Sequence, residues 1–312
     1  MPNIRDRRTS TSAAAAAAAL VCAAGCTPAG ARPDSDDGRL TVLTTFTVLA
    51  DMVANVAGDR VDVESVTRVG AEIHSYEPRP EDLVRGRDAD LVLHNGLGLE
   101  AWFTQFTEPV DAPTAVLSTG VETVPVVSGG HEGEPNPHAW MSPDNALVYV
   151  DNIAAALSEL DPPNADAYAA DAKDYKKRIR EIGEDLETEL AGVPRSQRAL
   201  VTCEGAFSYL ARDAGLAERY LWPVNSDTQA TPGQVASVVR FVRSNDVPTV
   251  FCETTVDSGT QQRVAEETGA ALDPDLYVDS LSPPDGPVPS YLDLLRYDTE
   301  AIAAGLTRKE DA

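Results

Sequence analysis

The feature that most constrains the fold of this chain is an alternation of short apolar segments with segments of helical periodicity, which occurs in both halves. Strands that alternate with helices build parallel sheets from strand–helix units, so the pattern predicts an α/β protein. The predicted strands are 40–45, 61–66, 90–94, 114–117, 200–203, 220–224, 250–253 and 276–278. The predicted helices are 48–58, 80–87, 144–160, 165–190, 206–214, 232–244, 258–268 and 291–306.

The segment 165–190 interrupts this alternation because it is much longer than the other helical segments. Its apolar residues recur at helical spacing, at Tyr168, Tyr175, Ile179, Ile182 and Leu186. The segment is either a spine between two lobes or an ordinary surface helix. Because 312 residues are enough for two domains, we expect an N-terminal lobe over 39–164, a connecting helix over 165–192 and a C-terminal lobe over 193–308.

The first residues have the layout of a secretory signal peptide. Arg5, Arg7 and Arg8 precede an apolar run at 13–21, and small residues then lead to Cys26. These small residues resemble a bacterial lipobox, in which the cysteine is lipidated; the alternative is an ordinary cleaved signal with an incidental cysteine.

We therefore predict a signal peptide over 1–25 and a flexible tether over 26–38, where Pro, Ala, Gly, Ser and Asp dominate. The apolar run is too short and too rich in alanine for a transmembrane helix, and no other segment is apolar enough to span a bilayer.

The charge of the chain excludes one class of partner. Its 50 acidic and 25 basic residues give a formal net charge of -25. Nucleic-acid binding requires clustered Lys and Arg, so we expect no nucleic acid as a partner. The acidic excess indicates instead a well-solvated surface.

Two of the four histidines lie in proline-bounded loops, His74 within Glu72–Pro78 and His138 within Pro135–Trp140. Glu204 and Asp279 occupy similar places after predicted strands in the second half. Ligands of open α/β sheets bind at the carboxyl ends of strands. The four side chains therefore suggest one enclosed metal site, although two loop histidines and two helix-capping acids are the alternative.

Two imidazoles and two carboxylates suit a borderline-to-hard divalent cation, and the carboxylates favour manganese or iron(II) over zinc. We interpret His94 as a packed, hydrogen-bonded residue and His131 as a solvated one.

Three other residues have open roles. Cys203 and Cys252 lie at or next to the ends of predicted strands, so they form either a disulfide or two buried thiols. Glu253 either orients a metal ligand or caps the next helix.

Five motifs follow one another in a fixed order along the chain: GAEIHSYEP at 70–78, NGLGLE at 95–100, NPHAW at 136–140, EGAFSYL at 204–210 and YVDSL at 277–281. Together they resemble the solute-binding component of zinc/manganese ABC importers, a family of two-lobed metal-receptor lipoproteins (cluster A-I), and the resemblance covers about 40–306. It implies two lobes joined by a spine helix, with a metal bound in the cleft between them.

The resemblance implies that His74, His138, Glu204 and Asp279 bind the metal. Family members carry His or Glu at the position of Glu204, and Glu204 resembles the manganese or iron type. The loop 126–134 lacks the long histidine-rich insertion found in many zinc-type members, which supports the same choice.

The implied protein is a receptor rather than an enzyme. It would bind Mn²⁺, or alternatively Zn²⁺ or Fe²⁺, outside the cell membrane and deliver the ion to an ABC permease that a cytoplasmic ATPase drives. The resemblance also implies a monomer, anchored as a lipoprotein through Cys26 to the outer face of the membrane. The alternatives are a metallohydrolase, which needs an open coordination position for water, and a surface adhesin.

Overall fold

The computed structural model describes residues 38–102, 112–127, 130–224, 230–273 and 275–308. Residues Arg39–Ala312 form one compact unit. The predicted signal peptide, Cys26 and the predicted tether up to residue 37 lie outside the described residues. Among the residues described, no helix combines the length and the apolar character needed to cross a bilayer.

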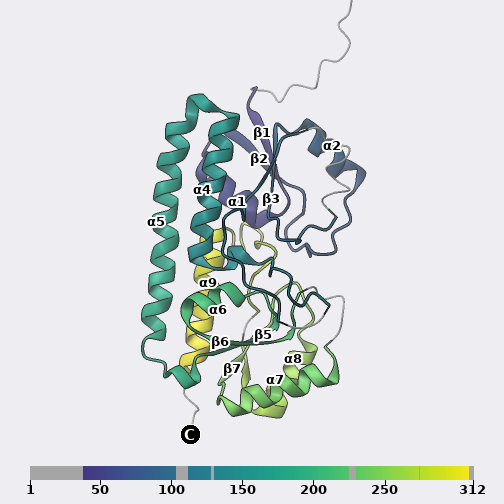
Figure 1. The fold of residues 1–312 in the computed structure, drawn as a ribbon, viewed down its shortest axis with the longest axis vertical. Coiled ribbons are helices and arrows are strands. Elements are labelled where there is room, and N and C mark those ends of the chain that lie inside the picture. Colours follow the sequence, from purple (N-terminus) through teal and green to yellow (C-terminus); the bar gives the residue numbers. More distant parts are fainter. Residues whose placement is uncertain (1–37, 103–111, 128–129, 225–229, 274, 309–312) are drawn as a thin grey trace, which may run out of the picture. The chain divides into compact units, whose positions relative to one another are not determined.

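The first half contains a four-stranded parallel sheet with the strand order β2-β1-β3-β4 (Figure 1). Its strands are β1 (Leu40–Thr44), β2 (Val61–Ser65), β3 (Leu91–His94) and β4 (Thr114–Val116). The helices α1 (Thr47–Ala57) and α2 (Pro80–Asp88) follow β1 and β2 along the chain. This is the predicted arrangement of strand–helix units, and it brings the carboxyl ends of the strands to one edge.

The second half contains two smaller parallel sheets, β5–β6 and β7–β8. Their strands are β5 (Ala199–Glu204), β6 (Ala217–Trp222), β7 (Thr249–Val250) and β8 (Ala271–Leu272). The helices are α6 (Ser208–Ala214), α7 (Pro232–Ser244), α8 (Gly259–Thr268) and α9 (Tyr291–Thr307).

Local sequence explains why α7 begins where the prediction placed it. Thr231 caps the helix, since its hydroxyl accepts a hydrogen bond from the Gln234 amide while the Gln234 side chain accepts one from the Thr231 amide. Pro232 occupies the first helical position, where a missing N–H costs nothing.

The predicted strand over 276–278 is wrong. The strand in this part of the chain is β8 (Ala271–Leu272), and Leu276 makes an isolated bridge to Glu253. The reason is that backbone groups of this segment form hydrogen bonds with side chains instead of with a neighbouring strand. The Tyr277 amide donates to the Asp298 carboxylate at 2.9 Å, and the Val278 carbonyl accepts from the Trp140 indole at 3.2 Å.

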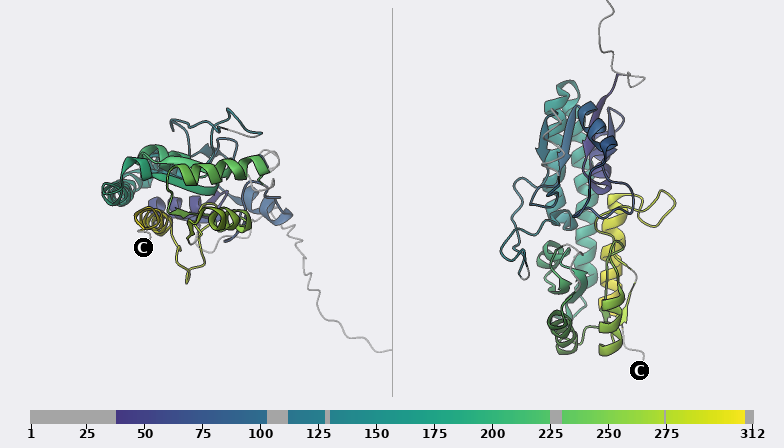
Figure 2. Two further views of the ribbon diagram at one scale, coloured as in Figure 1. Left: turned by 90° about the horizontal axis from the view of Figure 1, so that it is seen from below. Right: turned by 90° about the vertical axis from the view of Figure 1, so that its right-hand side faces the viewer.

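The long helix α5 (Ala165–Leu190) matches its predicted limits and follows α4 (Pro143–Leu160). It packs against α1 and α4 from the first half and against α9 from the second half (Figures 1 and 2). Its buried residues are Tyr168, Ala172, Tyr175, Ile179, Ile182, Leu186 and Leu190. The helix therefore contacts elements of both halves, as a spine does, and is not an ordinary surface helix. The predicted domain limits stay a prediction.

Candidate metal centre

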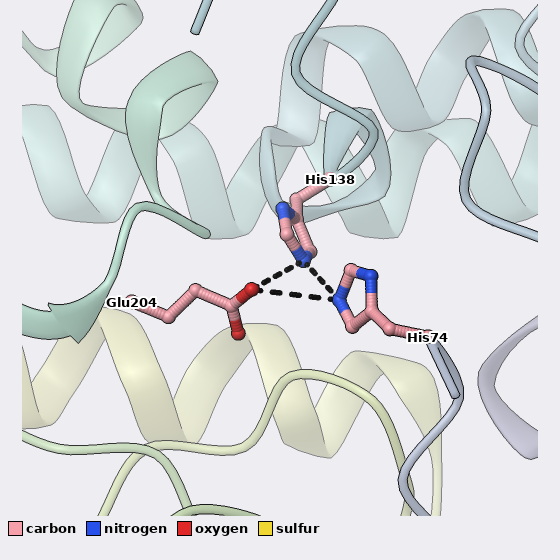
Figure 3. A group of neighbouring side chains, drawn as sticks. All are labelled: His74, His138 and Glu204. Carbon is pink, nitrogen blue, oxygen red and sulfur yellow. Dashed lines mark hydrogen bonds and ion pairs between the residues drawn. The ribbon is translucent and has the colours of Figure 1, made fainter. Parts of the chain in front are cut away.

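Three of the four predicted ligands meet at one point, His74 and His138 from two loops and Glu204 from the end of β5 (Figure 3). The Nε2 atoms of His74 and His138 are 3.1 Å apart. Glu204 Oε1 lies 3.5 Å from the first nitrogen and 3.7 Å from the second. Atoms bound at about 2.1 Å to one cation and at right angles lie roughly 3 Å apart, so these separations fit one coordination shell. All three side chains are at least 95% buried.

Asp279 approaches this group from the second half of the chain. Its ligand oxygen lies within 4.8 Å of ligand atoms of both His74 and Glu72. Asp279 Oδ2 accepts a hydrogen bond from the Thr255 hydroxyl at 3.1 Å, and Oδ1 is buried with no hydrogen-bond partner among the described residues. Burial and the charge of Glu72 raise the pKa of Asp279 to about 7. A cation beside these oxygens would satisfy Oδ1 and favour the ionised form.

The His74 loop is held by Glu72, to which the sequence analysis assigned no role. Glu72 Oε1 accepts from the His74 amide at 2.8 Å, and Oε2 accepts from both the amide and the hydroxyl of Ser75. Burial alone would raise the pKa of Glu72, but these hydrogen bonds outweigh it and lower the pKa. The Trp102 indole also donates to the Ile73 carbonyl. Glu72 thus sets the backbone that presents His74.

His138 is oriented by Asn136. Asn136 Oδ1 lies 3.0 Å from both the backbone nitrogen and Nδ1 of His138. Because an amide oxygen only accepts, His138 Nδ1 carries the hydrogen, and Nε2, which faces Glu204 and His74, is unprotonated and available to a cation. Burial and the nearby His74 ring hold the pKa of His138 well below its usual range, so the neutral, metal-binding form is favoured.

Asn136 also links this loop to the second half of the chain. Its Nδ2 donates to the Gly205 carbonyl at 2.6 Å, directly after Glu204, and the Tyr209 hydroxyl donates to its carbonyl. A similar link lies next to Asp279. The Gly70 amide, from the first half, donates to the hydroxyl of Ser280, the residue after Asp279, at 2.7 Å. Short hydrogen bonds between the halves therefore flank the ligands.

Glu204 is the last residue of β5, where the carboxyl end of the strand faces the loops. Its amide donates to both carboxylate oxygens of Glu253, at 3.2 Å and 3.1 Å. Burial raises the pKa of Glu253 well above its usual range. Glu253 contacts the backbone of Glu204, and the Ser258 residue that precedes α8 has no side-chain capping bond. The contacts between Glu253 and the Glu204 amide are those that the orienting interpretation expects, and the role of Glu253 stays a prediction.

Cys203 and Cys252 are joined in a disulfide. Both thiols are thereby consumed, so neither cysteine offers a thiolate to a metal in this state. The donor set near the ligands consists of imidazole nitrogens and carboxylate oxygens, which is the set of a borderline-to-hard divalent cation.

The other two histidines lie apart from this group. His131 is half exposed and its Nδ1 lies 2.9 Å from Glu134 Oε2. His94 is packed near Glu100, with 4.0 Å between Nδ1 and Oε2, and burial lowers its pKa to about 4.

Sequence reasoning missed Glu72, Asn136 and Thr255, which hold His74, His138 and Asp279 in place. Two of them were visible as near neighbours, since Glu72 and Asn136 each lie two residues before a predicted ligand and their side chains accept from that ligand's amide. Thr255 lies 24 residues before Asp279, and no local signal connects them.

The chain resembles known proteins over most of its length. The family model for the periplasmic zinc-uptake complex component A (ZnuA) matches residues 42–305. The iron-binding protein YfeA of Yersinia pestis is 46% identical over 274 residues, which cover 88% of each chain. The manganese ABC transporter substrate-binding lipoprotein PsaA of Streptococcus anginosus is 31% identical over 298 residues, covering 93% of this chain and 94% of the relative.

Solved structures agree with the fold. The Mn-bound periplasmic metal binding protein from Candidatus Liberibacter asiaticus superposes with a TM-score of 0.81 at 37% identity, covering 86% of this chain and all of the other. The periplasmic zinc binding protein TroA of Treponema pallidum has a TM-score of 0.79 at 21% identity and covers 87% of this chain, which shows the shared two-lobed fold.

These relatives are solute-binding receptors and not enzymes, so the metallohydrolase alternative is wrong. The homologues bind divalent metals, and the family supplies the extracytoplasmic substrate-binding component of ABC metal importers, which implies a permease and an ATPase as partners. The chain belongs to the zinc-uptake complex component A family of metal-binding, substrate-binding proteins of ABC transporters.

Proposed function

We propose that this protein binds Mn²⁺ through His74, His138, Glu204 and Asp279 and delivers it to an ABC permease. The observation that carries the proposal is the convergence of two imidazole nitrogens and Glu204 Oε1 within 3.7 Å. Asp279 Oδ1 lies nearby and has no hydrogen-bond partner among the described residues. Fe²⁺ and Zn²⁺ are the alternative cargoes.

The donor set supports Mn²⁺ or Fe²⁺ over Zn²⁺. Structural zinc sites favour imidazole and thiolate, whereas carboxylate oxygens suit the harder ions. Here the position that could have carried a third imidazole is Glu204, and the nearby thiols form a disulfide. Four side chains with one donor atom each give a coordination number of four. If Glu204, Asp279 or both bind the ion through two carboxylate oxygens, the coordination number rises to five or six. One relative is named for iron and others for manganese, so both ions belong in the test.

The proposal also covers the oligomeric state of the protein, its location and its attachment to the membrane. We place the protein as a monomer outside the membrane, attached by a lipid on Cys26, where it meets the permease. Relatives named as lipoproteins support the anchor. A role as an adhesin stays a prediction from the resemblance alone.

Thermal unfolding of the metal-stripped protein tests the metal assignment. A ligand of the native state at 100 times its Kd stabilises that state by about 2.7 kcal/mol, which raises Tm by several degrees in a chain of this size. Titration with Mn²⁺, with Zn²⁺ and, without oxygen, with Fe²⁺ should give a large shift with Mn²⁺ that survives modest competition from Zn²⁺. Stabilisation by zinc alone would overturn the manganese assignment while keeping the receptor.

Two substitutions locate the site. His74→Ala should weaken metal affinity at least about 100-fold, because it removes one nitrogen donor. His131→Ala is the matched control, since His131 is half exposed and pairs with Glu134 outside the group. Glu204→His should move the preference towards Zn²⁺. If His74→Ala binds metal as tightly as the unchanged protein, the proposed site is wrong.

A further inference from the structure

The disulfide between Cys203 and Cys252 joins the end of β5 to the segment that follows β7, since β7 ends at Val250. Successive side chains along a strand point to opposite faces. Cys203 and Cys252 are fully buried in one apolar cluster with Val242 of α7 and Val264 of α8. Glu204, one residue later in β5, therefore projects from the opposite face, where its carboxylate meets His74 and His138. A Glu253 carboxylate oxygen lies within 4.8 Å of both cysteine sulfur atoms, and the same carboxylate accepts the Glu204 amide.

Within the part of the chain that the structure describes, few backbone hydrogen bonds hold the end of β5 and the segment after β7 together. Strands β5 and β7 belong to separate two-stranded sheets. A backbone hydrogen bond from the Phe251 amide to the Val201 carbonyl at 2.8 Å crosses between them, and the Gln261 side chain donates to the Phe251 carbonyl at 2.9 Å. The disulfide between Cys203 and Cys252 is the covalent link across this junction, with 4.8 Å between the Cα atoms.

The residues that follow Cys252 reach both candidate ligands of the second half. Glu253 accepts the amide of Glu204 with both carboxylate oxygens. Two residues further on, the Thr255 hydroxyl donates to Asp279 Oδ2. Between them, the Thr254 amide donates to the Leu276 carbonyl at 2.9 Å, which ties the segment to the chain leading to Asp279.

We infer that the Cys203–Cys252 disulfide and the segment 252–255 act as one strut that positions Glu204 and Asp279 for metal binding. The inference rests on the proposed function, because it concerns the affinity of the same site. Cys203, Cys252, Glu253 and Thr255 are positioning residues that contact no metal themselves. Groups that orient metal ligands in this way commonly change affinity by about 10- to 100-fold when they are removed.

The test measures Mn²⁺ affinity of the purified protein by electron paramagnetic resonance of the free ion, well below the unfolding temperature. Cys203→Ala/Cys252→Ala should weaken affinity about 10-fold or more. Thr255→Val, which keeps the disulfide and removes the hydroxyl, should also weaken affinity, and Thr255→Ser should restore it. The Co²⁺ absorption spectra of the alanine pair and of Thr255→Val should shift, and that of Thr255→Ser should not, because the spectrum reports the arrangement of the ligands.

Val242→Ala is the matched control for a loss of stability, since Val242 packs in the same apolar cluster as both cysteines. It should lower Tm and leave Mn²⁺ affinity and the Co²⁺ spectrum unchanged. The strut is refuted if the alanine pair and Thr255→Val bind Mn²⁺ as tightly as the unchanged protein. It is also refuted if mass spectrometry of the unchanged protein finds free thiols at Cys203 and Cys252. If the unchanged protein binds none of Mn²⁺, Fe²⁺ and Zn²⁺, the proposed function and the strut fall together.

Discussion

At the scale of single residues, Asn136 connects the two halves of the candidate site. One side-chain amide accepts from His138 and donates to the Gly205 carbonyl, so it orients one predicted ligand and holds the residue after another. Both contacts are fully buried, and a buried hydrogen bond that loses one partner leaves the other unsatisfied.

We expect Asn136→Ala to weaken Mn²⁺ affinity about 10- to 100-fold, because His138 loses the acceptor that fixes its tautomer. Isothermal titration calorimetry of the metal-stripped protein measures the change. Asn152→Ala is the control, since Asn152 also donates to two backbone carbonyls, of Leu117 and Thr119, without touching a predicted ligand. Equal affinities in the two variants would contradict the assigned role.

Glu218 predicts a pH dependence of stability. Burial raises its pKa from 4.5 to about 7, although the Ser208 hydroxyl donates to it at 2.7 Å. Between these two values the folded protein holds a proton that the unfolded chain releases. The contribution of Glu218 is therefore fully present below pH 4.5 and is lost as the pH rises through 7.

Glu218→Gln should consequently stabilise the protein at pH 8 relative to the unchanged chain, by on the order of 1–3 kcal/mol, and should do so less at pH 5. Urea unfolding at both pH values measures the difference. Glu189→Gln, on the exposed side of α5, controls for the loss of one surface charge. An identical gain at both pH values would argue against a raised pKa.

At the scale of elements, α9 approaches β7 closely because Gly305 has no side chain. A Cβ atom there would lie 2.5 Å from Phe251 Cζ and 3.1 Å from Thr249 Cγ2, which is far inside contact distance. The Thr249 hydroxyl also donates to the Gly305 carbonyl at 2.9 Å. The helix thus packs on the strand that leads to Cys252, and its position depends on this one glycine.

Gly305→Ala should destabilise the protein by about 1–3 kcal/mol, since the overlap outweighs the gain of about 1 kcal/mol in helix propensity. Gly233→Ala in α7 makes the same change where the nearest atom to the new Cβ is 3.9 Å away, so it should be neutral or slightly stabilising. Guanidinium unfolding of both variants provides the comparison. A stabilised Gly305→Ala protein would show that α9 moves away easily.

At the scale of the whole molecule, the charge is strongly unbalanced, with a formal net value of -25. Self-repulsion of this size destabilises a compact state, and salt screens it. The surface ion pairs that salt also weakens contribute little individually, at about 0–1 kcal/mol each.

The Tm of the metal-stripped protein should therefore rise by a few degrees between about 20 mM and 500 mM NaCl, over which the Debye length falls several-fold. Differential scanning calorimetry at fixed pH, with a chelator present, measures this. A fall in Tm would mean that the local ion pairs outweigh the net charge.

The sequence by itself determined the order of strands and helices as far as α8, because periodicity and caps are local properties of the chain. The limits of α5 and α7 and the parallel strand–helix units followed from patterns within about 26 residues. It also singled out His74, His138, Glu204 and Asp279, through loop context and resemblance to a family, and their role as ligands stays a prediction.

Only the tertiary structure decided the matters that depend on contacts between distant segments. In the folded chain Cys203 and Cys252 form a disulfide, and Glu253 accepts a hydrogen bond from the Glu204 amide. The Tyr277 amide donates to Asp298 instead of to a neighbouring strand. Each of these groups had two locally acceptable arrangements. Which arrangement forms depends on partners that are 21 to 49 residues away in the sequence and become neighbours only on folding. No local sequence pattern encodes these contacts.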